Sequence, residues 1–387
     1  MKKFHLLIGI LFFLFLSSLS LRTGFAQQNQ NAQVPTQEFS NGLIIKILKQ
    51  GEKELAGLKN VYQIVQIKIL AGSDKGKVII VNYGGETSIT PAQEVSAGDT
   101  VILQKTQYAP NGKTGYIIYD KYRLTDMLYA ALAFFFLVLI IAGWRGVGSL
   151  LGLAISLAII LLYMIPQILS GANPLEVSVI ASTAILLFTT YLAHGVSKQT
   201  TIALLSTFAS LMLTVFIASL LVHSTQLTGM NSETATLLFG PTSRINLQGL
   251  LLAGIIVGTL GALNDITTTQ AATIFSLAEH DNKATFRKLF ITGFRVGREH
   301  IVSMVNTLVL AYTGSALALL LFVVLNPQKI PYWVILNNED LSDEIIRTFA
   351  GSMGLILVVP IVTLFAAFMC DKKIQLFLRE FLYAIVR

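Results

Sequence analysis

TIALLSTFASLMLTVFIASLLV, residues 201–222, is a stretch of the chain without a charged side chain. As an α-helix with a rise of about 1.5 Å per residue, it measures about 33 Å. The hydrocarbon layer of a bilayer is roughly 30 Å thick, so the stretch predicts a transmembrane helix. Six further apolar stretches predict crossings at about 127–143, 146–169, 177–193, 247–278, 301–325 and 349–369. The sequence therefore predicts an all-α polytopic membrane bundle of about seven transmembrane helices.

Composition agrees with a membrane protein. Hydrophobic residues make up 53% of the 387 residues and charged residues 13%, which is too little polar surface for a soluble globule of this length. The net charge of +7 raises the question of a nucleic-acid partner. Most basic residues outside the first domain flank apolar stretches, which is typical of membrane orientation, so the expected partner is the lipid bilayer and no nucleic acid. Cys370 is the only cysteine, which excludes a disulfide and a cysteine-based metal site, and no cofactor is expected.

The N-terminus has the order of an export signal. Lys2 and Lys3 precede an apolar stretch at about 6–21, and the small residues Gly24 and Ala26 follow it. This pattern predicts a signal peptide over residues 1–26, with an uncleaved anchor helix as the alternative. In either case, the following residues 27–122 are expected outside the cytoplasm.

Residues 27–122 predict a small β-rich extracytoplasmic domain. Its first residues, about 27–38, are rich in Gln and Asn and show no apolar period, so they predict a disordered leader. Short strands are predicted at about 61–69, 78–83, 100–103 and 116–119, with turn residues between them. Short strands joined by tight turns favour a closed or nearly closed β-barrel.

Residues 123–387 form the predicted membrane domain. With seven crossings, the basic cluster that includes Arg287, Lys288, Arg295 and Arg298 falls on the cytoplasmic side, where such residues concentrate. The same count places the C-terminus in the cytoplasm. The sequence thus predicts a multi-pass protein of the plasma (inner) membrane.

The fifth crossing contains the one polar cluster that resembles a site. About thirty nearly uncharged residues would form a helix of about 45 Å, so we expect a break at Asn264–Gln270, where Asp265 caps a second, shorter helix. Asp265, Asn264, Thr268 and Thr269 together supply hard oxygen ligands, which suit a proton, Na⁺ or a small divalent cation. Broken helices recur at the ion sites of transporters.

Other residues are expected to surround this cluster. Gly254, Gly258 and Gly261 fall on the side of the helix that leads to Asp265, where small residues allow close helix packing. Asn306 on the sixth crossing would complete the site if the two helices pack together, and Arg295, Arg298 and His300 would lie at its inner mouth. The alternative is that Asp265 is a helix cap near the cytoplasmic interface. The depth of Asp265 decides between the two.

Three motifs resemble the YibE/F family of bacterial multi-pass membrane proteins. They are Gly261-Ala-Leu-Asn-Asp265-Ile-Thr-Thr-Thr-Gln270-Ala, Gly293-Phe-Arg295-Val-Gly297-Arg298 and Asn306-Thr-Leu-Val-Leu-Ala-Tyr312. The resemblance spans the membrane region and includes the exported domain. It implies a bacterial inner-membrane location, the topology given above and a permease-like role, but it supplies no substrate and no catalytic residue.

The leading functional hypothesis is a transporter or permease for an ion or small solute, acting alone, as a homo-oligomer or with a paired membrane subunit. The alternative is a non-transporting protein, in which the helices anchor an envelope-binding, signalling or scaffold domain. An enzyme is not expected, because the HExxH and Walker A motifs are missing and no histidine matches the membrane serines in depth.

Overall fold

The computed structural model describes residues 38–55, 58–84, 89–106, 115–232, 234, 245–281, 284–326 and 328–371. The predicted signal peptide at 1–26 and nearly all of the predicted leader lie outside these residues. The chain divides into two compact units, with the boundary between Leu137 and Val138.

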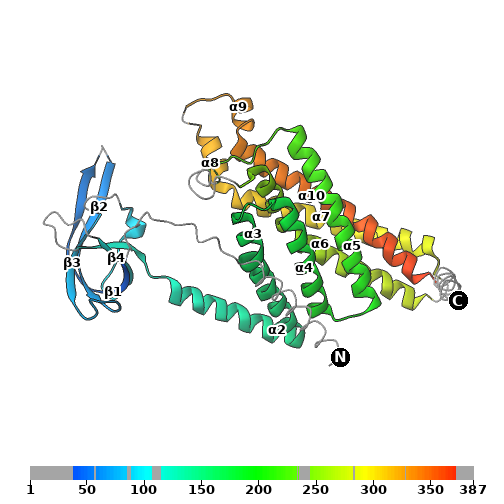
Figure 1. Cartoon of the computed structure of the whole chain (residues 1–387), viewed down its shortest axis with the longest axis horizontal. Coiled ribbons are helices and arrows are strands. Elements are labelled where there is room, and N and C mark those ends of the chain that lie inside the picture. The colour runs from blue at the N-terminus through cyan, green and yellow to red at the C-terminus, as the bar shows by residue number, and fades with distance from the viewer. Residues whose placement is uncertain are drawn as a thin grey trace. The chain divides into compact units, whose positions relative to one another are not determined.

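The first unit contains a five-stranded antiparallel sheet with the strand order β3-β2-β1-β4-β5 (Figure 1). The strands are β1 (Glu38–Leu55), β2 (Leu58–Ile69), β3 (Val78–Tyr83), β4 (Thr100–Thr106) and β5 (Gly115–Lys121). Register shifts between Ile44 and Lys46 and between Ile47 and Lys49 mark bulges in β1, which bend a strand and increase its twist. The sheet therefore curls into a half-barrel around an apolar core that includes Val65, Ile67 and Leu103.

The four predicted strands correspond to β2, β3, β4 and β5, but the prediction omitted β1, the central strand. The half-barrel also differs from a fully closed barrel, because within the described residues no strand pairing joins β3 to β5. A buried glutamine of β2 binds a residue outside the sheet. The side chain of Gln63 accepts a hydrogen bond from Val95 N at 2.9 Å and donates one to Val95 O at 3.0 Å. Both backbone groups of Val95, a buried residue that belongs to no strand, therefore have a partner.

The second unit is helical. The helices are α2 (Leu124–Ile159), which starts in the first unit, a π-helical turn (Ile160–Met164), α3 (Ile165–Leu169), α4 (Pro174–His194), α5 (Lys198–Ser224), α6 (Leu247–His280), α7 (Phe286–Ser315), α8 (Leu317–Leu325), α9 (Tyr332–Leu336) and α10 (Glu339–Cys370). Five helical segments of the described chain are long and apolar enough to span a membrane, or six if α7 and α8, bent by 67°, count as one broken span.

The count of five or six candidate spans is lower than the predicted seven, and much of the difference lies in the first one. The helical segment Leu124–Leu169 covers 46 residues, which is about twice the length that one crossing requires. Gly143 inside it has non-helical backbone angles, φ 57° and ψ −140°. The sequence predicts the turn between the first two crossings at this same point.

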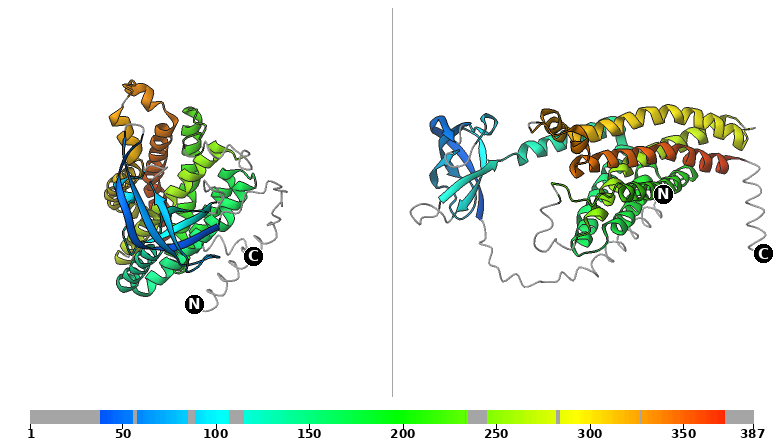
Figure 2. Two further views of the ribbon diagram at one scale, coloured as in Figure 1. Left: turned by 90° about the vertical axis from the view of Figure 1, so that its left-hand side faces the viewer. Right: turned by 90° about the horizontal axis from the view of Figure 1, so that it is seen from above.

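Helices α6 and α10 form the centre of the bundle. Helix α10 contacts α5, α6 and α7, and α6 contacts α4, α5, α7 and α10. Figure 2 shows α7 and α10 side by side over most of their lengths. Glycines permit this packing, because a Cβ atom on Gly351 of α10 would lie 2.7 Å from the Thr259 Cγ2 of α6.

The predicted break in the fifth crossing is wrong, because α6 is one continuous helix of 34 residues. The hydroxyl groups of Thr267 and Thr268 donate to the Asn264 carbonyl oxygen at 2.9 and 3.0 Å. These side chains therefore bond to their own helix and leave its backbone ladder intact. The extra length of α6 is matched by α7 and α10, which contain 30 and 32 residues.

Candidate functional site on helix α6

Three polar residues of α6 join it to four neighbouring helices. Asn264 Oδ1 accepts from Thr190 Oγ1 of α4 at 2.9 Å, and Thr267 Oγ1 lies 2.6 Å from Thr207 Oγ1 of α5. Gln270 Nε2 donates to Thr363 Oγ1 of α10 at 2.9 Å and to the Gly293 carbonyl of α7 at 2.8 Å. The residues follow one another in steps of three, so they turn around α6. We call Asn264, Thr267 and Gln270 the polar belt.

The polar belt is mostly buried. Thr267 and Gln270 are fully buried, as are their partners Thr207 and Thr363. Gln270 Oε1 is buried without a hydrogen-bond partner among the described residues, although a buried amide oxygen normally has one. Helix α7 approaches the amide closely because it has no side chain there: a Cβ on Gly297 would lie 2.9 Å from Gln270 Nε2.

Asp265 lies on a different face of α6, together with Gly254, Gly258 and Gly261. We call these four residues the glycine face. A Cβ on Gly254 or Gly261 would have no atom within 4 Å, whereas one on Gly258 would lie 2.8 Å from Tyr312 Oη. Of the three glycines predicted to pack, only Gly258 thus has a close neighbour. Asp265 is exposed and does not point into the bundle, as a residue of a buried ion site would.

The depth of Asp265 follows from the register between α6 and α10. The contacts of Thr259 with Gly351 and of Gln270 with Thr363 show that the two helices run parallel, offset by about 92 residues in number. Asp265 is therefore level with about Leu357 of α10. The uncharged part of α10, Thr348–Cys370, is about 34 Å long and has Val359 at its midpoint. By this register Asp265 is level with the middle of the uncharged stretch of α10.

The end of α4 lies close to this level. Helix α4 is parallel to α6, since Pro174 meets Gly249 and Thr190 meets Asn264, so His194 is level with about Thr268. Helix α6 continues for about another 18 Å to His280. Asp265 is therefore level with the terminus of α4.

The remaining predicted residues are spread over two helices. Thr268 is partly buried and Thr269 is exposed, one turn beyond Asp265. Asn306, Arg295 and Arg298 are exposed on α7, and His300 is partly buried there. Within the described residues, no hydrogen bond joins Asn306 to Asp265, so the structure does not assemble the two into one site.

Sequence reasoning missed the partners of the polar belt. Thr190, Thr207 and Thr363 are fully buried hydroxyl residues on three other helices. One signal was present in the sequence: Ser206, Ser210 and Thr214 recur every four residues on α5, and all are buried. Among the described residues, no group of three or more His, Cys, Asp or Glu side chains is arranged to hold a metal ion.

Comparison with known proteins identifies a family that the chain matches. The family model described as YibE/F-like protein matches residues 130–372, which is more than half of the chain. No curated protein and no solved structure matches.

Proposed function

Since the chain belongs to the YibE/F-like family and spans the membrane several times, we propose that it is a permease that moves an ion or small solute past Asp265. The observation that carries the proposal is the position of this carboxylate. Asp265 is the only charged residue between Arg244 and Glu279, and the register with α10 makes it level with the middle of an uncharged stretch. Ionisable groups at such depth usually serve a function.

Contact of Asp265 with lipid would be unfavourable. An ionised aspartate at the centre of a membrane helix costs roughly 2.5–3.5 kcal/mol on insertion scales. The open glycine face leaves room beside the carboxylate, and Asn264 and Thr268 add an amide and a hydroxyl on the adjoining surface. Water or a cation on this face would lower the cost. The exposed position of Asp265 therefore suits an ion or solute that passes along this face better than one that is permanently buried.

The proposed topology gives this site a route to the cytoplasm. With a turn at Gly143, Leu124–Leu169 supplies two crossings, and with α7–α8 as one crossing the total is seven. The His194 end of α4 then faces the cytoplasm, as does Cys370. Because α4 ends near the level of Asp265, a solute would reach the carboxylate from the cytoplasm past that end. The proposal involves no catalytic step.

Flux in proteoliposomes tests the proposal. H⁺, Na⁺ and Mg²⁺ fluxes would be followed with internal fluorescent indicators, for the unaltered protein and for Asp265→Asn. We expect flux of at least one cation and a loss of at least tenfold in the variant. Glu279→Gln is the matched control, because it removes an exposed acid from the same helix about 21 Å away and should leave flux unchanged. Equal flux in Asp265→Asn and the unaltered protein would remove the site, and no flux of any tested ion would count against the class.

A second candidate function rests on the half-barrel. Phe39, Ile117 and Tyr119 are 46%, 45% and 63% exposed, and the rings of Phe39 and Tyr119 form an edge-to-face pair with centroids 5.4 Å apart. This apolar cluster is a candidate binding surface. In this alternative, the domain binds an envelope component and the helices anchor it. Rescue of a deletion strain by residues 40–122, tethered to an unrelated helix, would favour this function over transport.

A further inference from the structure

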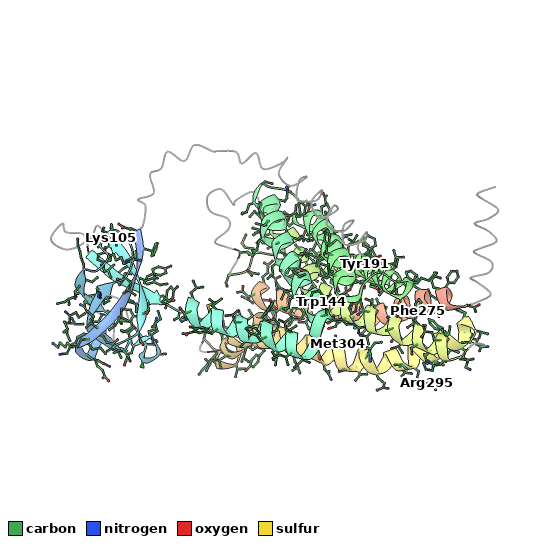
Figure 3. All side chains as sticks on the ribbon, turned by 90° about the horizontal axis from the view of Figure 1, so that it is seen from below. Lys105, Trp144, Tyr191, Phe275, Arg295 and Met304 are labelled. Carbon is green, nitrogen blue, oxygen red and sulfur yellow. The ribbon has the colours of Figure 1, made fainter. Side chains whose placement is uncertain are left out.

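Helix α7 presents an uncovered, mostly polar line of residues to the outside of the bundle. Its members are spaced in alternating steps of four and three, and all are exposed: Arg295, Glu299, Val302, Asn306, Val309 and Thr313. The opposite side of α7, with Gly293, Gly297 and Leu308, is buried against α6 and α10. Figure 3 shows Arg295 on the side of α7 that faces away from the other helices of the bundle. We call these six residues the α7 seam.

The seam lies at a depth where charge is unfavourable. A Cβ on Gly297 would meet the Val359 side chain, and Val359 is the midpoint of the uncharged stretch Thr348–Cys370 of α10. Arg298 and Glu299, the next residues on α7, therefore lie close to the middle of that stretch. Both are exposed, and neither forms an ion pair within the described part of the chain. Charged side chains at such depth seldom face lipid, and they normally pair with each other.

The first crossing of the same chain does not offer a suitable cover. Residues 127–144 contain no charged side chain, so that helix has nothing to pair with Arg298 or Glu299. A second copy of the chain offers both signs of charge at the same depth. Its seam also provides an amide at position 306, and an amide both donates and accepts hydrogen bonds, so Asn306 can pair with its own counterpart.

The spacing of the seam fits two parallel helices. Steps of four and three place Arg295, Val302 and Val309 in one core position of a seven-residue repeat, and Glu299, Asn306 and Thr313 in the other. In such a pair, each core side chain inserts among four residues of the facing helix. Glu299 would thus lie among Arg295, Arg298, Glu299 and Val302 of the second copy, and the contact is reciprocal. A single polar Asn in this position is known to fix register.

We propose that two copies of this chain form a dimer in the membrane, with the α7 seams packed against each other around a two-fold axis normal to the bilayer. The same surface patch serves both copies, as such symmetry requires. The interface brings each Glu299 next to the arginines of the other copy and removes both signs of charge from lipid. This proposal does not depend on transport.

Cysteine cross-linking in native membranes tests the contact. In a Cys370→Ser background, Asn306→Cys should form a disulfide-linked dimer on mild oxidation. Phe216→Cys is the matched control: Phe216 is 64% exposed on α5, and it lies at a similar depth because Thr214 meets Gly354 while Leu308 meets Gly351. We expect at least tenfold more dimer for position 306. Equal cross-linking at the two positions would overturn the proposal.

A charge exchange tests the pairing itself. Glu299→Arg should raise the dissociation constant of the full-length dimer in nanodiscs at least tenfold, measured by single-molecule photobleaching. The combination of Glu299→Arg with Arg298→Glu restores opposite charges across the axis and should recover most of the affinity. The melting temperature of each variant separates loss of the dimer from loss of the fold. A folded, monomeric unaltered protein, or a dimer that is insensitive to Glu299→Arg, would refute the interface.

Discussion

Replacement of Gly297 by alanine should weaken the contact between α7 and α10, whereas the same replacement at Gly261 should not. A Cβ on Gly297 would overlap the Val359 side chain and lie 2.9 Å from Gln270 Nε2. A Cβ on Gly261 would have no atom within 4 Å. The two substitutions are chemically identical and lie on neighbouring helices of one bundle, so their difference measures the contact.

The magnitude follows from what the added methyl group displaces. Val359 is fully buried and β-branched, so its χ1 angle has essentially one rotamer in a helix and the side chain cannot turn away. Overpacking of this kind costs about 1–3 kcal/mol. Displacement of the Gln270 amide would also weaken two hydrogen bonds, worth about 0.6 kcal/mol each in membrane proteins. Both variants gain about 0.5–1 kcal/mol of helix propensity, which cancels in the comparison.

We therefore expect Gly297→Ala to be less stable than Gly261→Ala by about 2–4 kcal/mol. Thermal unfolding of the full-length protein in detergent, followed by circular dichroism, would register this as a difference of roughly 5–15 °C in Tm. Equal melting temperatures would refute the close packing of α7 on Gln270. A lower Tm for Gly261→Ala than for the unaltered protein would show instead that another helix covers the glycine face.

Three further predictions concern the hydrogen bonds of both units. A double-mutant cycle of Thr207→Val and Thr267→Val should give a coupling free energy of about 0.6 kcal/mol, and up to about 1.7, whereas zero coupling would deny the 2.6 Å contact. Gln63→Leu should leave the buried N–H and C=O groups of Val95 without partners, and each unpaired group should cost about 1–3 kcal/mol of stability. Hydrogen exchange of the Val95 amide should therefore accelerate at least tenfold, whereas the control Gln50→Leu should change it little. In the third, hydrogen bonds from Lys77, Tyr116 and Lys105 hold the pKa of Asp74 below its ordinary value, so the stability it contributes is present above that value and is lost as pH falls through the folded pKa. Burial and the bond to Asp74 raise the pKa of Tyr116 to about 12, so the stability that Tyr116 contributes is complete below pH 10 and is lost as pH rises through 12. Asp74→Asn should therefore flatten the acid side of a plot of the free energy of unfolding against pH.

Much of the fold is readable from the sequence because uncharged stretches and alternating strands are strong local signals. The omission of β1 has a local cause. Its two bulges insert extra residues at Ile45 and Leu48, so the apolar residues Ile44, Ile45, Ile47 and Leu48 lose the two-residue alternation that marks a strand. Only the pairing of β1 with β2 and β4 determines its form, and that pairing is not local.

The candidate site was predictable only in part. Asp265 is conspicuous because it is the sole charge in a long apolar stretch. The predicted break failed because Asn264 and the threonines bond within α6 or to other helices, and those partners depend on the register of four helices. No feature of a single sequence fixes that register. The depth of Asp265, which decides between a site and a helix cap, depends on it as well.

The level of the α7 charges relative to α10 is fixed by contacts, wherever the membrane boundary is drawn. A shift of the bilayer toward Arg347 would release Arg295 and Arg298 into water, but α7 is tied to α10 by the contacts of Gly293 with Thr363 and of Gly297 with Val359. The same shift would expose the last third of α10 to water, where Leu364 and Phe368 are each 44% exposed. It would also place the uncharged end of α5, Thr200–Ala203, in water, because Ala203 packs at that level beside Val362. One placement thus leaves the α7 charges in lipid, and the shifted one leaves apolar parts of α10 and α5 in water. A polar partner that covers α7 avoids both, so it explains the exposed charges more simply than a shifted membrane does.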